Sequence, residues 1–314
     1  MIVDTDFRDW LLAASTPAIR YQTLSRLLAL PPDDVQVQAA QQAVMSEGPV
    51  PIMLAAQTAV GPWPDESSYY TPKYSSTHWS LLLLTEWGVD GQDAGFGRGV
   101  DFMLAETAVS IANRFTNATN LDLACLWGNI LRYALHAGRL HDPRTQAIIT
   151  YLAQSVQNGG CQCVYNSGLG CAWGVARALW GLAAIPVADR SHAVNEALAQ
   201  GVDFLLNRFS LAAADYPAPE GGKIHPLWFK LNFPLFYQTD ILFVLRVLAE
   251  LGALNEPGAA PALAWLVARR GRNGRWRGSS PYRSRTWACL GDRTETDRWV
   301  SLQAALILSR SKSL

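Results

Sequence analysis

The sequence predicts an all-α protein built from repeated helix pairs. Four apolar helical runs each end at a Gly or Pro, and after a short turn each is followed by a helix that carries an aromatic residue beside leucine. The four stops are Gly88, Gly138, Pro186 and Gly252. The units recur at roughly 50 to 60 residues, which is typical of stacked helix pairs that cannot bury their apolar faces alone. No Pro/Gly/Ser-rich linker divides the array, so residues 1–314 are expected to form a single domain.

A 3.6-residue periodicity sorts the predicted helices into two alternating series. The series expected outside begins near Asp4, Asp33, Gln92, Pro143, Arg190 and Pro257. The series expected inside begins near Ala18, His78, Asp122, Cys171, Asp240 and Trp299. Proline in a first helical turn supports the starts at Pro17, Pro143 and Pro257. We place the more apolar series inside and the more charged series outside.

The two ends of the chain predict that the array closes on itself. The chain opens on an outer helix, Asp4 to Ala14, with no partner before it. It ends on an inner helix, Trp299 to Ser309, with no partner after it. If these two helices pair, six inner and six outer helices form a closed (α/α)6 toroid, and no open end needs a polar cap.

Composition argues against several classes of protein. The 26 basic and 26 acidic side chains give a formal net charge of zero, which does not favour a nucleic-acid binder. The first residues lack the basic and apolar regions of a signal peptide, and no apolar run reaches the ~20 residues that span a bilayer. Five cysteines, an odd number, do not indicate a secreted disulfide framework. We therefore expect a cytoplasmic protein without a transmembrane segment.

Five motifs give the chain a family resemblance. They are Tyr74-Ser75-Ser76-Thr77-His78-Trp79, Cys125-Leu126-Trp127-Gly128-Asn129, Cys171-Ala172-Trp173-Gly174-Val175, Phe233-Pro234-Leu235-Phe236-Tyr237-Gln238-Thr239-Asp240 and Asn273-Gly274-Arg275-Trp276. Together they resemble the α/α toroid of terpenoid cyclases and protein prenyltransferases, in particular bacterial prenyltransferase or squalene-cyclase-like repeat proteins. The resemblance implies an enzyme that acts on an isoprenoid-like or polycyclic apolar substrate in an aromatic-lined central cavity.

In such a toroid the starts of the inner helices converge on one mouth of the cavity. The candidate catalytic residues there are His78, Asp240, Asp122 and Asp297. The candidate substrate-binding residues are Tyr74, Trp79, Trp127, Trp173, Tyr237, Trp287 and Trp299. As a general acid or base, His78 would need a pKa near the working pH. The alternatives are that the acids cap helices, that His78 bonds to a backbone carbonyl and that the aromatic rings fill the barrel.

Two cyclase motifs are missing from the sequence. An acid-initiated cyclase carries an Asp-x-Asp-Asp run, and the nearest approach is Glu295-Thr296-Asp297-Arg298. Arg298 would keep a neighbouring carboxylate ionised, whereas a protonating acid needs a raised pKa. No Asp-Asp-x-x-Asp cluster for Mg²⁺ is present either. The expected chemistry is therefore acid–base or cation-stabilising chemistry without these motifs.

Three cysteines suggest a second function. Cys161, Cys163 and Cys171 lie close enough in the sequence to hold Zn²⁺, with His78 or water as a fourth ligand. Cys171 matches the zinc-binding Cys of protein prenyltransferases, but Leu169 stands where their Asp would lie. A zinc-dependent transferase-like site is thus one alternative, and ordinary buried thiols or a disulfide-forming pair are the others. A non-catalytic helical-repeat scaffold is the third function that the sequence leaves open.

Two loops are further candidates for contact with a ligand or a partner. The insertion from Asp215 to Trp228 is rich in Pro and Gly, and it is expected either to gate the cavity or to serve as a plain connector. From Arg269 to Arg285 the chain carries seven arginines, which would suit a diphosphate or an acidic partner. The simpler interpretation is a solvated loop.

Overall fold

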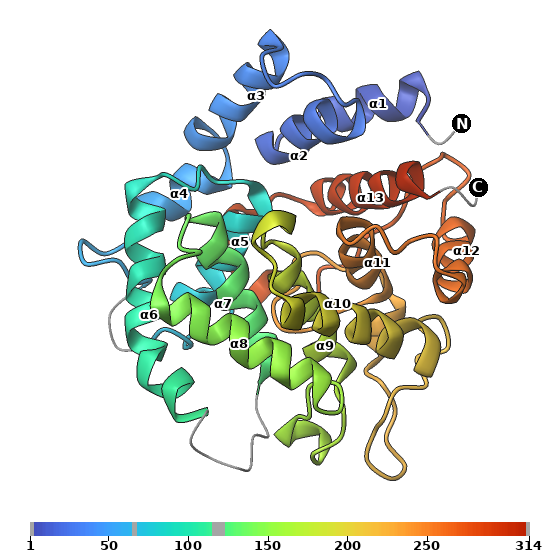
Figure 1. Cartoon of the computed structure of the whole chain (residues 1–314). Coiled ribbons are helices and arrows are strands. Elements are labelled where there is room, and N and C mark those ends of the chain that lie inside the picture. The colour runs from blue at the N-terminus through green and yellow to red at the C-terminus, as the bar shows by residue number, and fades with distance from the viewer. Residues whose placement is uncertain (1–2, 65–67, 115–122, 312–314) are drawn as a thin grey trace.

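The structure is a computed structural model that describes residues 3–64, 68–114 and 123–311. All regular elements in these ranges are helices, and the only β-structure there is three isolated bridges (Figure 1). The all-α prediction is confirmed. Within the same ranges, no helix has the length and apolarity needed to cross a membrane.

The predicted inner series is present as helices that pack on one another in sequence. Its members are α2 (Pro17–Gln22) with the π-helix η1 (Thr23–Leu27), α5 (Thr77–Trp87), α7 (Ala124–His136), α9 (Ala172–Ala183), α11 (Ile241–Glu250) and α13 (Arg293–Arg310). Helix α5 contacts α7, α7 contacts α9, α9 contacts α11, α11 contacts α13, and α13 contacts α2 and η1. Helix α13 begins earlier than expected because Asp292 caps it, accepting a hydrogen bond from the Glu295 N–H at 3.0 Å.

The predicted outer series flanks these helices. It consists of α1 (Thr5–Leu12), α3 (Val35–Ser46), α6 (Ala94–Arg114), α8 (Pro143–Gln157), α10 (His192–Asp203) with the π-helix η4 (Phe204–Arg208), and α12 (Ala260–Ala268). Helix α4 (Pro49–Ala55) was not expected from the sequence. Short 3₁₀ turns complete the chain: η2 (Val164–Asn166), η3 (Val187–Asp189), η5 (Pro226–Phe229), η6 (Pro257–Ala259), η7 (Arg283–Arg285) and η8 (Ala288–Leu290).

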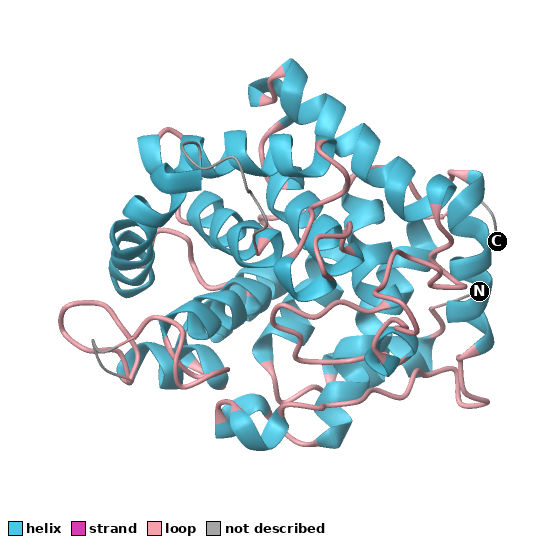
Figure 2. Cartoon of the chain, turned by 90° about the horizontal axis from the view of Figure 1, so that it is seen from below, coloured by secondary structure: helices cyan, strands magenta, loops and turns pink. Residues whose placement is uncertain are grey.

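The first and last helices of the chain lie side by side, as the sequence predicts (Figures 1 and 2). Glu295 of α13 fixes this junction. Its carboxylate accepts hydrogen bonds from the backbone N–H groups of Ser15 (3.1 Å) and Thr16 (2.8 Å), in the turn between α1 and α2, and it pairs with Arg298. Burial alone would raise the pKa of Glu295, but the bonds from Thr16 and Arg298 lower it overall.

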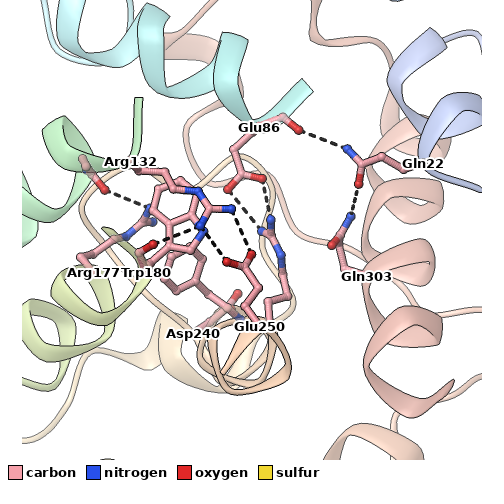
Figure 3. A network of polar contacts seen from close by, with 11 residues as sticks. Gln22, Glu86, Arg132, Arg177, Trp180, Asp240, Glu250 and Gln303 are labelled. Carbon is pink, nitrogen blue, oxygen red and sulfur yellow. Dashed lines mark hydrogen bonds and ion pairs between the residues drawn. The ribbon is translucent and has the colours of Figure 1, made fainter. Parts of the chain in front are cut away.

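A polar network joins the inner helices (Figure 3). Arg246 of α11 donates two hydrogen bonds to the Glu86 carboxylate of α5, at 3.3 and 2.7 Å. Arg132 of α7 donates two to Glu250 of α11, at 2.7 and 3.1 Å. The Gln22 side chain of α2 donates to the Glu86 carbonyl at 3.2 Å. Ion pairs therefore link α5 and α7 to α11, and the neutral Gln22 amide adds α2 to the network.

Arg177 of α9 is a fully buried cation within the same interior. Its guanidinium donates to the Gln238 carbonyl at 2.6 Å and to Asn129 Oδ1 at 3.3 Å, and it lies 3.9 Å from the centre of the Phe243 ring. Burial lowers the pKa of Arg177 to about 9. The sequence predicts an aromatic interior, and this buried cation was not predicted.

Candidate functional site

A cavity of about 740 Å³ lies at the starts of three inner helices. The first residues of α5, α7 and α9 line it together with residues 69–73, Tyr237 and the loop 216–225. A volume of this size suits a ligand as large as a drug molecule. The starts of three helices of the predicted inner series thus converge on one cavity, whereas the starts of α13 and α2 are not part of its lining.

His78 is the predicted catalytic residue that the structure places in this cavity. Its side chain is fully buried, and Nδ1 lies 3.2 Å from the Tyr133 hydroxyl, not against a backbone carbonyl. Nε2 has no hydrogen-bond partner among the described residues. Burial, with a smaller effect of the Arg177 charge, lowers the pKa of His78 to about 3. This value lies well below the pH at which a general acid or base works, so the imidazole is neutral at pH 7, with Nε2 buried in the cavity wall.

The low pKa of His78 predicts an acid-sensitive fold. The unfolded imidazole takes up a proton near pH 6.5, while the folded one stays neutral down to about pH 3. The contribution of His78 to the free energy of unfolding is fully present above pH 6.5 and falls as the pH drops toward 3. Between pH 7 and pH 5 we expect the free energy of unfolding, measured with urea, to fall by about 2 kcal/mol more in wild type than in His78→Asn. The exposed His141→Asn serves as control, and equal losses in wild type and His78→Asn would contradict the assignment.

Three of the predicted substrate-binding rings line the cavity: Trp79, Trp173 and Tyr237. The Trp79 and Tyr237 ring centroids are 6.1 Å apart, and so are those of Trp173 and Tyr237. Trp79 Nε1 donates to the Tyr70 carbonyl at 2.8 Å, which fixes the indole. Sequence reasoning missed further lining rings because they lie on loops, outside the helical pattern: Tyr69, Tyr70, Tyr165 and Tyr216.

The other four predicted rings are not part of the lining. Tyr74 is buried with its ring centroid 4.6 Å from that of Phe236. Trp299 stacks on Phe233 at 4.4 Å. Trp127 is also buried, and Trp287 Nε1 donates to Ser80 Oγ at 3.0 Å. For these four the alternative, that aromatic rings fill the interior, describes the structure better.

Asp240 is a buried helix cap outside the cavity lining. One carboxylate oxygen accepts from the Phe243 N–H at 2.7 Å, and the other accepts from the backbone N–H and the side-chain amide of Asn232, both at 2.8 Å. Burial raises the pKa of Asp240 to about 6, although these bonds act in the opposite direction. Its three hydrogen bonds hold the loop before α11 against the helix start, which is a structural role.

The other two predicted acids do not add to the described site. Asp297 of α13 accepts a hydrogen bond from the Gly278 N–H at 2.6 Å and does not line the cavity. Asp122 lies outside the described residues. Within the described part of the chain, the cavity lining contains no Asp or Glu.

Two of the three predicted metal-binding thiols, Cys163 and Cys171, line the cavity, and they are joined there by Cys125 of α7. The Cys171 thiol is hydrogen-bonded to Cys163, and it accepts from the Gly174 N–H at 3.4 Å as the cap of α9. Cys161 is buried behind the wall and bonds to Ser155.

The thiols do not form the predicted zinc site. Among the residues that the structure describes, no group of three or more His, Cys, Asp or Glu side chains is placed to hold a metal ion. Burial raises the pKa of both Cys125 and Cys161 to about 12, and the bond to Cys163 together with burial raises that of Cys171. Without a metal these three thiols therefore keep their protons at neutral pH. Buried thiols, the first alternative from the sequence, fit this arrangement.

The insertion between Asp215 and Trp228 forms one wall of the cavity through residues 216–225. Tyr216 Oη donates to the Leu205 carbonyl at 2.9 Å, and the Asn166 amide donates to the Pro217 carbonyl at 3.0 Å. At the other end Trp228 is fully buried, and its Nε1 donates to the Leu211 carbonyl at 3.1 Å. The loop is therefore an anchored part of the site, not a plain connector.

The arginine-rich segment is largely engaged with its own chain. Arg283 donates to the Asp292 carbonyl at 2.9 Å and to Thr296 Oγ1 at 2.6 Å. Arg270 donates to the Gly274 carbonyl at 2.7 Å, and Arg275 pairs with Asp6 at 3.0 Å. These contacts stabilise the loop and its junction with the N-terminal helix, and none of the segment lines the cavity.

Comparisons with protein-family models, with characterised proteins and with solved structures gave no match for this chain. Evidence for a function therefore comes from the cavity itself.

Proposed function

We propose that this protein is an (α/α)6 toroid of the cyclase and prenyltransferase type that binds an apolar small molecule in the cavity at its inner helix starts. The contact between α1 and α13 supports ring closure, as does the consecutive packing of the inner helices. The observation that carries the proposal is the cavity of about 740 Å³, with Trp79, Trp173 and Tyr237 in its walls. Flat rings of this kind suit polycyclic or isoprenoid-like bodies.

The chemistry that this site supports best is proton removal by His78. A neutral imidazole cannot protonate a substrate as imidazolium would, and the described lining holds no carboxylic acid. If a substrate that carries its own leaving group ionises between the aromatic walls, the leaving group departs as an anion, and the carbocation can then lose a proton to Nε2 and become an alkene, because a carbocation gives up a proton even to a weak base. We therefore propose acid–base or cation-stabilising chemistry on an apolar substrate. A non-catalytic binding scaffold would use the same cavity without this step.

The binding proposal is tested with N-phenyl-1-naphthylamine, a neutral probe whose fluorescence rises in apolar surroundings. We expect one molecule to bind per chain, with a Kd on the order of 1–10 μM. Leu126→Trp fills space at the cavity wall and should weaken binding about tenfold or more. Ile52→Trp adds the same ring on the exposed surface of α4 and should leave binding unchanged.

Two results would overturn the proposal: no probe binding to wild type, or equal binding to wild type and a folded Leu126→Trp variant. Native mass spectrometry of the purified protein gives the natural ligand. The enzyme and the scaffold are then separated by His78→Asn. In an enzyme this variant still binds that ligand but no longer converts it, whereas a scaffold converts it in neither form.

A further inference from the structure

Among the described residues, the charged side chains that line the cavity are both lysines. Lys73 and Lys223 line it, both are exposed, and no acidic side chain of the described residues lines it with them. The salt bridges formed within the described ranges include neither lysine. The two ammonium groups are thus available to a ligand.

Lys73 lies beside two of the aromatic rings that line the cavity. Its Nζ lies 5.6 Å from the centroid of the Tyr70 ring and 5.5 Å from that of Tyr237, and both rings line the cavity. An ammonium beside two rings is attracted to their faces, although only weakly at an exposed site. These contacts keep the positive charge at the edge of the aromatic wall, within reach of a head group whose body lies deeper.

The polar groups deeper in the cavity add donors but no carboxylate within the described residues. The indole N–H of Trp173 is a donor that has no acceptor there. The Asn166 amide, also in the lining, already donates to the carbonyls of Gly170 and Pro217. An unpaired buried donor is costly, so a ligand acceptor at this position would be favoured.

From this charge and donor pattern we infer that the cavity takes an amphipathic anion: an apolar body between Trp79, Trp173 and Tyr237, and one carboxylate, sulfonate or phosphate group near Lys73 and Lys223. Complementary charge favours such a head group. A quaternary ammonium ligand, which aromatic walls alone would suit, is repelled by the two lysines. The inference rests on the proposed function, because it assigns the head group of a ligand of that same cavity.

A matched pair of probes tests the inference. 8-Anilinonaphthalene-1-sulfonate has the same aromatic body as N-phenyl-1-naphthylamine and carries one added sulfonate. At low ionic strength wild type should bind the sulfonate at least about tenfold more tightly than the neutral probe. The double variant Lys73→Gln/Lys223→Gln should reduce that preference, taken as the ratio of the two dissociation constants in the same variant, to about threefold or less. Lys230→Gln removes an exposed lysine that does not line this cavity and should keep the full preference.

The outcomes separate the two proposals. If the neutral probe binds and Leu126→Trp weakens it, but the sulfonate is not preferred or its preference survives in the double variant, the anionic head group is wrong and the cavity proposal stands. If neither probe responds to Leu126→Trp, both fail. Thermal unfolding of the lysine variants confirms that they are folded, which is expected because both side chains are exposed.

Discussion

Replacing Gly128 with alanine should destabilise the fold by about 4 kcal/mol or more, or prevent folding altogether. A Cβ built on Gly128 of α7 would lie 2.2 Å from the carbonyl oxygen and 2.4 Å from the carbonyl carbon of Arg177 in α9. These are backbone atoms within a helix, so no side-chain rotation can relieve the overlap, and the two helices would have to separate. Urea unfolding measures the effect.

Gly97→Ala in α6 is the matched control, since it adds the same methyl group to another helical glycine. There the Cβ would lie 3.5 Å from a terminal nitrogen of the Arg139 side chain, which is an ordinary contact. This variant should be stabilised by about 0.5–1 kcal/mol, because alanine favours a helix over glycine. A Gly128→Ala protein within 1 kcal/mol of wild type would show that α7 and α9 are not packed as described.

The crossing of α7 and α9 also explains one of the motifs behind the family resemblance. A Cβ on Gly181 of α9 would lie 2.6 Å from the Gly128 carbonyl oxygen, so the two glycines permit the same close approach. Next to Gly128, the Asn129 amide donates to the Phe236 carbonyl at 2.9 Å. The segment Trp127-Gly128-Asn129 is thus occupied with packing and structural hydrogen bonds.

The helices could be predicted from the sequence because their signals are local. Pro17 and Pro143 occupy first turns, and Asp142 and Asp240 cap the helices that follow them. The order of inner and outer helices follows from periodicity alone. Helix α4 was missed because Pro49 and Pro51 in so short a segment resemble a loop more than a helix.

The cavity was predicted less completely because its walls are assembled from segments distant in the sequence. His78, Trp79, Trp173 and Tyr237 were found, since helix starts converge in stacked pairs. Asp240 caps α11 outside the cavity lining, and the sequence could not show this because a capping aspartate and a catalytic one look alike in sequence. Cys125 joins Cys163 and Cys171 only through the packing of α7 on α9, and no spacing rule could have indicated that contact.

The polar network between the inner helices should prove structural and should not be part of the binding site. Glu86 and Arg246 have side chains only 7% and 18% exposed, and neither lines the large cavity. Glu86→Ala leaves the buried Arg246 without its carboxylate, which should cost about 3–5 kcal/mol in urea unfolding. Arg8→Ala, which breaks an exposed ion pair with Asp9, is the control and should cost less than about 1 kcal/mol.

The double variant Glu86→Leu/Arg246→Met shows whether Glu86→Ala is unstable because Arg246 is left as an unpaired charge or because the contact between the two side chains is lost. Because both charges are removed together, most of the stability lost in Glu86→Ala should return. Neutral-probe binding should match wild type, since the cavity walls are untouched. If the double variant is as unstable as Glu86→Ala, the loss of the ion pair itself, and not the unpaired charge of Arg246, accounts for the lost stability. If a folded double variant no longer binds the neutral probe, the network also maintains the shape of the cavity.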